Sequence, residues 1–346
     1  MAPKPSSKAK PNIRMVAERA QLSPATVSLA LRGSARIAAE TRERVLAAAR
    51  ELNYVPAPRL GRSSQVAGRH VLYVTKDFGD RPVTANPFYG EVLSAAEREC
   101  AEQGAKLTFT LLSDAGHTDE QLASAFAGHK PDGVLLVGAY AAPLVRRITA
   151  LVQAPLVLVD NVVPGLSCDS VMADDYGGAQ LSTRHLIDLG HRQIAAIVGN
   201  LHMPSFAARY QGYCVACAEA GVSAAPPTEA VWERPALRAA LEQILSRDPR
   251  PTAIFCVTDF YAVFVMELLR DFGLQVPDDI SVVGFDDLPI ARMAHPPLTT
   301  LHNHPQVLGR LGIQRLMARI NGDDMPGLNI TVTTQLILRG STQPPA

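Results

Sequence analysis

Apolar residues recur at spacings of three and four in three short stretches near the start of the chain, a pattern that predicts amphipathic helices. We expect helices at residues 13–20, 24–31 and 40–52. Ser23 is a suitable N-cap for the second helix, and Pro24 fits its first position, where a missing N–H costs nothing. The residues expected to face inward are Val16, Ala17, Ala20, Val27, Ala30, Leu31, Val45, Leu46, Ala49 and Leu52. Three short helices with a tight connection between the first two are typical of a helix-turn-helix, whose second helix enters the major groove of DNA.

From His70 onward, short apolar runs alternate with helical patterns. The predicted strands are residues 71–74, 107–111, 133–137, 156–159, 194–198, 253–257 and 281–285. The predicted helices are residues 87–103, 120–126, 143–152, 179–189, 209–220, 236–246 and 261–272. This alternation indicates parallel sheets covered by helices on both faces, and its two sets of units predict two similar subdomains with a cleft between them.

The charge is unevenly distributed, although the formal net charge of the 346 residues is zero. Residues 1–69 carry 13 Lys and Arg and four Glu, a net charge of +9, so the remainder carries −9. A basic N-terminal region is expected to bind an anionic polymer, and an acidic body is expected to stay away from it. Residues 1–11, with three lysines and three prolines, predict a disordered basic arm.

Several function classes are disfavoured. Five cysteines without regular spacing argue against a disulfide scaffold, and the absence of a membrane-length apolar run or a signal peptide leads us to expect a cytoplasmic protein. No phosphate loop, nucleophile elbow or dinucleotide fingerprint is present, so we expect neither an enzyme nor a cofactor. Cys214 and Cys217 fit reduced packing within a helix, and His302 and His304 lack a third metal ligand, so no metal site is expected.

The N-terminal residues resemble those of the lactose/galactose-repressor (LacI/GalR) family. The matching stretches are Ile13–Ala20, Ser23–Leu31, Thr41–Leu46 and Leu52–Pro56. The rest of the chain also resembles this family and, through it, the sugar-binding proteins of the periplasm. Its matching stretches are Asn86–Tyr89, Val159–Asn161, His185–Ala195, Arg209–Tyr213, Val276–Asp287, Pro296–Thr300 and Leu336–Gly340. Their order and spacing are far more specific than a single amphipathic helix.

The resemblance implies a helix-turn-helix domain at residues 12–56, a hinge at 57–69 and an effector-binding and dimerisation domain at 70–342. It also implies three crossings between two subdomains, near Asn161, Ala291 and Gly322. The first subdomain is then expected at about residues 70–161 and 292–322, and the second at about 162–291 and 323–342.

Asp160 and Asp286 each follow an apolar strand, and ligands of open parallel sheets bind beyond the carboxyl ends of strands. The guanidinium of Arg209 suits a pair of hydroxyls or a carboxylate, although it also fits a surface ion pair, and Asp286 with Asp287 also fits a simple turn. The resemblance assigns to the effector pocket Phe88, Tyr89, Asp160, Ser205, Arg209, Trp232, Thr258 and Asp286. Thr258 stands where the family usually has Asn, which leaves the ligand's identity open.

The resemblance also assigns DNA contacts to the second helix and to the segments after it. The expected DNA-binding residues are Ser23, Pro24, Ala25, Thr26, Ser28, Leu29, Arg32, Arg36, Tyr54, Arg59 and Leu60. Leu29 stands where many members carry Arg, the commonest reader of guanine, so this helix is apolar and suited to thymine methyl groups. Gln21 and Ala38 replace the usual Gly of the turn and Ser of the third helix cap, each at a cost of about 1 kcal/mol.

The hinge departs further from the family, in which this segment forms a short helix on DNA and inserts a leucine into the minor groove. Here Ser63 stands at the leucine's usual position and Leu60 lies three residues earlier, while Pro58 and Gly61 disfavour a helix. Either Leu60 is the inserted residue, or the segment is a plain linker whose arginines reach phosphates.

We therefore expect an all-α helix-turn-helix head joined to an α/β, periplasmic-binding-protein-like domain of two doubly wound subdomains. The expected function is that of a homodimeric repressor that reads a near-palindromic operator and responds to a small-molecule effector, with a sugar as the leading candidate. One alternative is a small-molecule binding protein whose head has lost DNA binding. The other, a catalytic sugar-modifying protein, has no motif behind it. The sequence leaves open whether the effector releases or promotes DNA binding.

Overall fold

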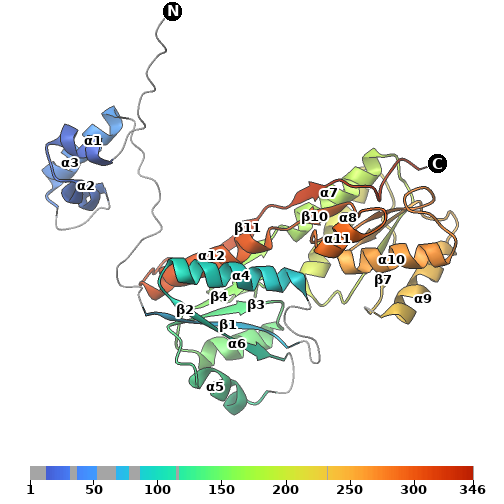
Figure 1. Cartoon of the computed structure of the whole chain (residues 1–346), viewed down its shortest axis with the longest axis horizontal. Helices are drawn as coiled ribbons and strands as arrows, with labels where there is room; N and C mark the ends of the chain where they lie inside the picture. The colour runs from blue at the N-terminus through green and yellow to red at the C-terminus, as the bar shows by residue number, and fades with distance from the viewer. Residues whose placement is uncertain are drawn as a thin grey trace, which may run out of the picture. The chain divides into compact units, whose positions relative to one another are not determined.

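The computed structural model describes residues 13–31, 37–52, 68–77, 86–113, 117–231 and 233–345. The chain forms two compact units, Met1–Arg62 and Ser63–Ala346 (Figure 1). The expected basic arm and almost all of the expected hinge fall outside the described residues. No helix among the described residues is long and apolar enough to cross a membrane.

The first unit, called the head below, is a bundle of helices that bury their apolar faces against one another. Val16, Val27 and Val45 are completely buried at its centre. Between the first two helices Gln21 has a φ of +55°, the left-handed conformation expected for this turn. The described helices of the head are α1 (Ile13–Ala20), α2 (Pro24–Leu31) and α3 (Ala39–Glu51). The three predicted helices are thus confirmed.

The larger unit contains a six-stranded parallel sheet with the order β11-β5-β4-β3-β1-β2. Its strands are β1 (His70–Lys76), β2 (Lys106–Leu112), β3 (Gly133–Val137), β4 (Leu156–Val159), β5 (Asp169–Ala173) and β11 (Asn329–Val332). Successive side chains of a strand point to opposite faces. Tyr73 therefore packs beneath α4 and α12, whereas Leu72 packs against α5 and α6 on the other face (Figure 1).

The helices of this layer are α4 (Pro87–Glu102), α5 (Asp119–Ala127), α6 (Ala142–Leu151) and α12 (Pro305–Ile320). Helix α12 lies so close to α4 that a Cβ atom at Gly309 would overlap the carbonyl oxygen of Val92. The sequence pattern did not predict α12, because Gly309 and Gly312 lower its helical propensity. Close packing against α4 compensates for that low propensity.

A second parallel sheet has the order β7-β6-β8-β9 and one continuous apolar core. Its strands are β6 (Ile194–Val198), β7 (Thr228–Glu229), β8 (Ala253–Cys256) and β9 (Ser281–Val283). Helix α7 packs against α8, and α9 packs against α10 (Figure 1). The helices are α7 (Asp175–Asp188), α8 (Pro204–Glu219), α9 (Arg234–Leu245), α10 (Asp259–Asp271) and α11 (Pro289–Met293). An antiparallel pair, β10 (Thr300–His302) and β12 (Gln335–Ile337), lies beside β9.

The strand pairing differs from the expected subdomain boundaries. Strands β5 and β11 complete the first sheet, although residues 162–173 and 329–332 were expected in the second subdomain. The chain therefore crosses between the layers after β5, after β10 and after β11, rather than near Asn161, Ala291 and Gly322. Both strands mix polar with apolar residues, so their pattern was too weak to predict a strand.

Candidate functional site

The N-terminus of α2 is fixed by Ser23, as expected from the sequence. The Ser23 hydroxyl accepts a hydrogen bond from the backbone N–H of Thr26 at 3.1 Å, and its carbonyl accepts from Val27 at 3.0 Å. The side chains of Ser23 and Thr26 also meet, with their hydroxyl oxygens 2.9 Å apart. This cap satisfies a backbone donor that would otherwise be free and fixes where α2 begins.

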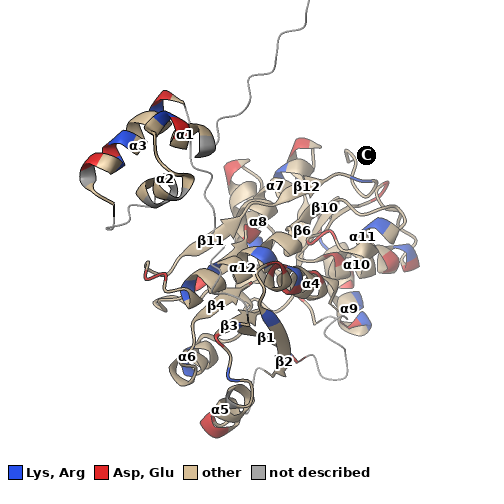
Figure 2. Cartoon of the chain, turned by 60° about the vertical axis from the view of Figure 1, so that its left-hand side comes forward, with Lys and Arg blue, Asp and Glu red and all other residues tan. Residues whose placement is uncertain are grey.

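Helix α2 carries no charged residue (Figure 2). Its Val27 and Ala30 are buried in the head core, whereas Ser23 and Pro24 are exposed and Thr26 is half-buried. Ala25, Ser28 and Leu29 belong to the same helix. The other predicted DNA-binding residues, Arg32, Arg36, Tyr54, Arg59 and Leu60, lie outside the described residues. Helix α2 therefore offers only small polar and apolar groups for the base contacts predicted from the sequence.

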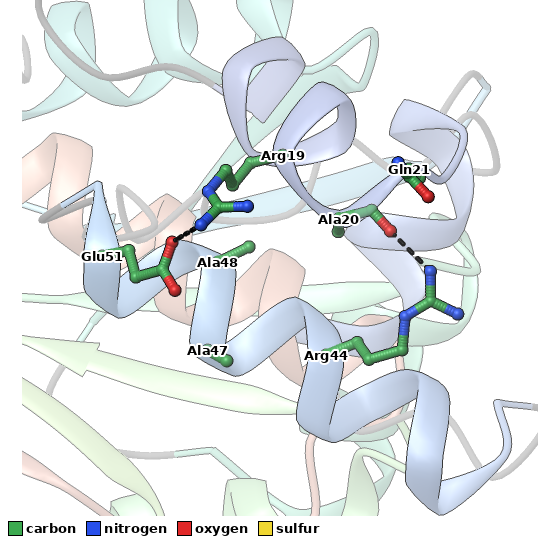
Figure 3. Close-up of a pocket in the computed structure, with 7 residues that line it drawn as sticks. All are labelled: Arg19, Ala20, Gln21, Arg44, Ala47, Ala48 and Glu51. Carbon is green, nitrogen blue, oxygen red and sulfur yellow. Dashed lines mark hydrogen bonds and ion pairs between the residues drawn. The ribbon is translucent and has the colours of Figure 1, made fainter.

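Two arginines of the head brace its helices (Figure 3). The Arg44 guanidinium of α3 donates to the carbonyl oxygen of Ala20 at 2.8 Å, where α1 ends. Arg19 pairs with Glu51 at 2.6 Å, but both side chains are more than half exposed, so that pair contributes little. These contacts line a shallow pocket between α1 and α3. Arg44 thus helps to set the position of the turn that precedes α2.

In the larger unit, Asp160 directly follows β4 and has a φ of +56°. The Tyr89 hydroxyl, from the first turn of α4, donates to Asp160 Oδ2 at 2.7 Å. Both side chains are buried. The Phe88 ring meets the Tyr89 ring edge-on, 5.0 Å away, and belongs to the same apolar core. Sequence reasoning proposed all three residues, and the structure brings them together at the end of a strand.

Arg209 lies in the second turn of α8 and is surrounded by protein groups. Its Nε donates to Asp175 Oδ1 at 2.8 Å, its Nη1 donates to the carbonyl oxygen of Val257 at 2.7 Å, and its Nη2 lies 3.0 Å from Asp286 Oδ1. The Phe285 ring covers the guanidinium at 3.8 Å. Arg209 is only 5% exposed, so the expected alternative of a surface ion pair is wrong. Its guanidinium is held as a buried positive charge between two carboxylates.

Asp286 follows β9 and has a φ of +112°, a region that a non-glycine residue rarely adopts. Its Oδ1 also accepts a hydrogen bond from Asn303 Nδ2 at 2.9 Å. The backbone N–H of Asp286 donates to the Leu301 carbonyl at 2.8 Å, which holds the strained residue against β10. The neighbouring Asp287 points to a different set of partners, Arg292, Arg339 and His302. Asp286 and Asp287 therefore do not form a simple exposed turn.

The electrostatics of these residues are coupled because they are buried together. Burial, followed by the negative charge of Asp175, raises the pKa of Asp160 to about 7. Burial also raises the pKa of Asp286 to about 6, against the opposing effect of Arg209. The pKa of Arg209 is raised by Asp286 and Asp175 despite its burial. The guanidinium thus stays charged, while the two carboxylates ionise near neutral pH.

The other predicted effector residues take different positions. Ser205 is buried in the first turn of α8, and Thr258 caps α10 by accepting a hydrogen bond from the Tyr261 backbone at 3.4 Å. Trp232 lies outside the described residues. Sequence reasoning missed Asp175 and Asn303. Because the strands before them, β5 and β10, were not predicted, nothing marked either residue as the end of a strand.

Comparison with known proteins identifies the family. Residues 12–57 match the model described as "Bacterial regulatory proteins, lacI family", and residues 183–342 match the model described as "Periplasmic binding protein-like domain". Over 330 residues the chain is 32% identical to the ribose operon repressor of Haemophilus influenzae, with 94% of this chain and 97% of the relative covered. The chain belongs to the lacI family.

Other lacI-family proteins match along nearly their whole length. The HTH-type transcriptional repressor PurR of Pasteurella multocida is 30% identical over 335 residues, with 96% of this chain and 98% of the relative covered. A solved complex of the transcriptional regulator CelR with cellobiose has a TM-score of 0.72 and 29% identity, covering 96% of this chain and 99% of the other. A Lac repressor dimer bound to operator and the anti-inducer ONPF has a TM-score of 0.70 and 25% identity, covering 97% and 100%.

Membership of the lacI family confirms the predicted fold class, a helical head joined to a periplasmic-binding-protein-like domain with parallel sheets. The lacI-family chain is a DNA-binding repressor controlled by a small-molecule effector. Its family consists of transcriptional regulators rather than enzymes.

Proposed function

We propose that this repressor binds a near-palindromic operator as a homodimer and that a sugar bound at Asp160, Arg209 and Asp286 controls it. The observation that carries the proposal is the buried cluster of charged residues at the ends of β4 and β9, one from each sheet. Ligands of open α/β sheets bind at this edge. Carboxylates there accept hydrogen bonds from hydroxyl groups, which are the dominant polar groups of a sugar.

The names of similar proteins support a sugar as the effector class. One relative is a ribose operon repressor, and one similar structure is a complex with cellobiose. Phe88 packs against Tyr89, whose hydroxyl donates to Asp160. Phe88 is therefore proposed as part of the pocket wall. Thr258 and Ser205 remain proposed contacts, with Thr258 also capping α10.

The three crossings between the sheets are proposed as the links that transmit the ligand's effect. Two of them are joined directly, because the backbone N–H of Asp174 donates to the Val332 carbonyl at 2.8 Å. A ligand that binds better to one relative orientation of the subdomains shifts the population toward that orientation. We propose that this change acts on a helix-turn-helix domain at residues 12–56 through the segment 57–69, and that residues 70–342 bind the effector and the second subunit.

Strand β2 supports a homodimer. It is the edge of the six-stranded sheet, and its Phe109 and Leu111 are 55% and 41% exposed. Apolar side chains on an unpaired edge are typical of an interaction surface. A pair of heads related by a two-fold axis matches a near-palindromic site and buries more surface than one head.

The DNA-binding part of the proposal is tested by selecting duplexes from a random pool with the full chain. We expect an inverted repeat, because each head should read one half-site. Enrichment of single half-sites would contradict the dimer. If no duplex were enriched while sugars still bound the protein, the chain would be a small-molecule binding protein whose head has lost DNA binding.

The effector part is tested by a thermal-shift screen of sugars, followed by calorimetry. Asp286→Asn should weaken binding of a sugar found in the screen roughly tenfold to a hundredfold, because a charged hydrogen-bond partner is lost. The control is Asp271→Asn, on the exposed side of α10, which should bind as the wild type does. Equal affinities of wild type and Asp286→Asn would place the effector elsewhere.

A further inference from the structure

The cluster at the proposed effector site holds more acidic than basic groups among the described residues. Asp160, Asp175 and Asp286 are 7%, 4% and 9% exposed, and Arg209 is the cation that contacts two of them. Buried ionised carboxylates are costly unless each is paired. One guanidinium neutralises only one of three negative charges, so the cluster with all three carboxyls ionised has a net charge of −2.

Arg209 is already engaged by the protein. Each of its three nitrogens has a partner, namely Asp175, the Val257 carbonyl and Asp286, and the Phe285 ring lies over its plane. A guanidinium bound in this way holds two carboxylates in place. Beside its proposed contact with the effector, Arg209 therefore also supports the acceptors around it.

An independent observation concerns two buried polar atoms in the same region. The Tyr73 hydroxyl and the Asn303 amide oxygen are buried and have no hydrogen-bond partner among the described residues. Tyr73 lies near Asp160, whose negative charge adds to burial in raising the pKa of the phenol. Asn303 donates its amide N–H to Asp286, which leaves its oxygen free beside that carboxylate. Because buried polar atoms are normally paired, the Asn303 oxygen points to a partner that supplies an N–H or O–H group. The Tyr73 hydroxyl points to a partner that can accept its O–H or donate to its oxygen.

We propose that the effector is a small polyhydroxylated molecule that carries a protonated amine, such as an amino sugar, whose ammonium group lies among Asp160, Asp175 and Asp286. This inference rests on the proposed effector site. Neutral hydroxyls supply donors but no charge, whereas an ammonium supplies three N–H donors and the missing positive charge. Hydroxyls on the same molecule then bind the Tyr73 hydroxyl, as acceptor or donor, and donate to the Asn303 oxygen.

The raised pKa values of Asp160, about 7, and Asp286, about 6, agree with this assignment. Both carboxyls are harder to ionise in the ligand-free protein because burial and repulsion from Asp175 oppose their negative charges. A cation within the cluster removes that repulsion.

Matched pairs of sugars test the amine directly. D-glucosamine, D-galactosamine and D-mannosamine are each compared with the parent sugar by thermal shift and calorimetry at neutral pH. We expect at least one amine to bind about tenfold or more tightly than its parent, as is typical for a hydrogen bond to a charged group. Asp160→Asn, which keeps the size and the acceptor for Tyr89, should reduce that preference to near parity.

Asp132→Asn serves as the matched control. Asp132 precedes β3 at the amino ends of the strands, away from the proposed site, and binds Arg69 and the His70 backbone. Its replacement should leave the preference for the amine unchanged. If Asp160→Asn does not fold by circular dichroism, Asp175→Asn replaces it, because it removes a charge from the same cluster.

The outcomes separate this inference from the proposed function. A parent sugar that binds as tightly as its amine, or better, would overturn the amine while leaving a sugar-controlled repressor intact. Binding of none of the six compounds at millimolar concentration would also overturn it, and duplex selection would still report on repressor function. An undiminished preference in both Asp→Asn variants would show that the amine is bound elsewhere.

Discussion

Asp169, at the start of β5, is bound by groups from two other parts of the chain. Its carboxylate accepts hydrogen bonds from Arg315 and Arg319 of α12 at 2.7–3.0 Å and from the Leu328 backbone at 2.8 Å. The Asp169 side chain is fully buried, and these donors hold its pKa below the usual range. One carboxylate thus fastens α12 to β5 and to the segment before β11.

Asp169→Ala should lower the free energy of unfolding by about 3–5 kcal/mol, because it removes the carboxylate that two mostly buried arginines share. Urea denaturation of the full chain measures the loss. Asp324→Ala, in the exposed stretch before β11, is the control and should change stability by no more than about 0.5 kcal/mol. A small loss in Asp169→Ala would mean that the arginines find other acceptors.

Ala38 precedes α3 with extended backbone angles, and its side chain cannot cap the helix. Ala38→Ser supplies a hydroxyl for a free N–H of the first turn and should stabilise the head by about 1 kcal/mol. The readout is the thermal unfolding transition of the head. Ala47→Ser, an exposed position inside α3, should instead lower stability slightly, because Ser is a weaker helix former than Ala. Equal effects of both substitutions would exclude capping as the cause.

The raised pKa of Asp160 predicts that the free energy of unfolding depends on pH. Its folded-state pKa of about 7 is raised above its ordinary value of 3.8, so the folded protein binds this proton more tightly than the unfolded chain. The carboxyl's contribution is therefore greatest at low pH and is lost as the pH rises through about 4 to about 7. Asp160→Asn cannot ionise and should lose less stability over that interval, by about 1 kcal/mol or more. Urea denaturation at about pH 5 and about pH 7.5 compares the two slopes, and identical slopes would show an ordinary pKa.

At the scale of elements, β2 is the outermost strand of the six-stranded sheet and is paired only on the side of β1 among the described strands. Its Leu107, Phe109 and Leu111 point to the same face as Tyr73, and Leu107 packs against the core under α4. Phe109 and Leu111 are not covered by α4 and are exposed. A strand that is apolar on its exposed part is expected to meet a second subunit.

Phe109→Lys should convert the dimer to a monomer at micromolar concentration, because a charge would be placed in an apolar interface. Analytical ultracentrifugation measures the mass. Leu151→Lys changes an exposed apolar residue on α6, on the opposite face of the same sheet, and should leave the dimer intact. A dimeric Phe109→Lys protein would move the interface away from β2.

The strength of a local pattern decided which elements could be predicted. Strands β1 and β3 are continuous apolar runs and were predicted, whereas β5 and β11 contain Asp, Ser, Asn and Thr and were not. The same limit applies to the site. Asp160 and Asp286 follow recognisable strands, but Asn303 follows β10, a short strand whose place beside β9 depends on pairing between distant residues.

At the scale of the whole molecule, the chain separates charge along its length. Residues 1–69 carry a net charge of +9 and the remainder −9. Since α2 itself has no charge, the cations that approach DNA phosphates must come from the surrounding segments. Phosphate contacts supply affinity and base contacts supply specificity, so we expect this chain to divide the two tasks between different residues.

Operator affinity should therefore fall steeply with salt, by at least about a hundredfold between roughly 50 and 200 mM, because two heads release condensed counterions. Arg36→Ala should weaken binding to operator and to random duplex equally and should reduce the salt slope by about 2 for the dimer. Fluorescence anisotropy titrations give both values. Arg184→Ala, whose side chain pairs with Glu219 on the larger unit, is the control. A changed preference at one base pair would make Arg36 a base reader.

The positions of β11 and β12 have a consequence for biogenesis. Strand β11 completes the first sheet, β12 pairs with β10, and Ser341 exchanges hydrogen bonds with Val282 of β9. Neither α/β layer can therefore be finished until residues 329–343 have left the ribosome, whereas the last described helix of the head ends at Glu51. At ordinary rates of synthesis the two events are separated by roughly 15 to 60 s. During translation the part that reads DNA is complete well before the part that answers to the effector.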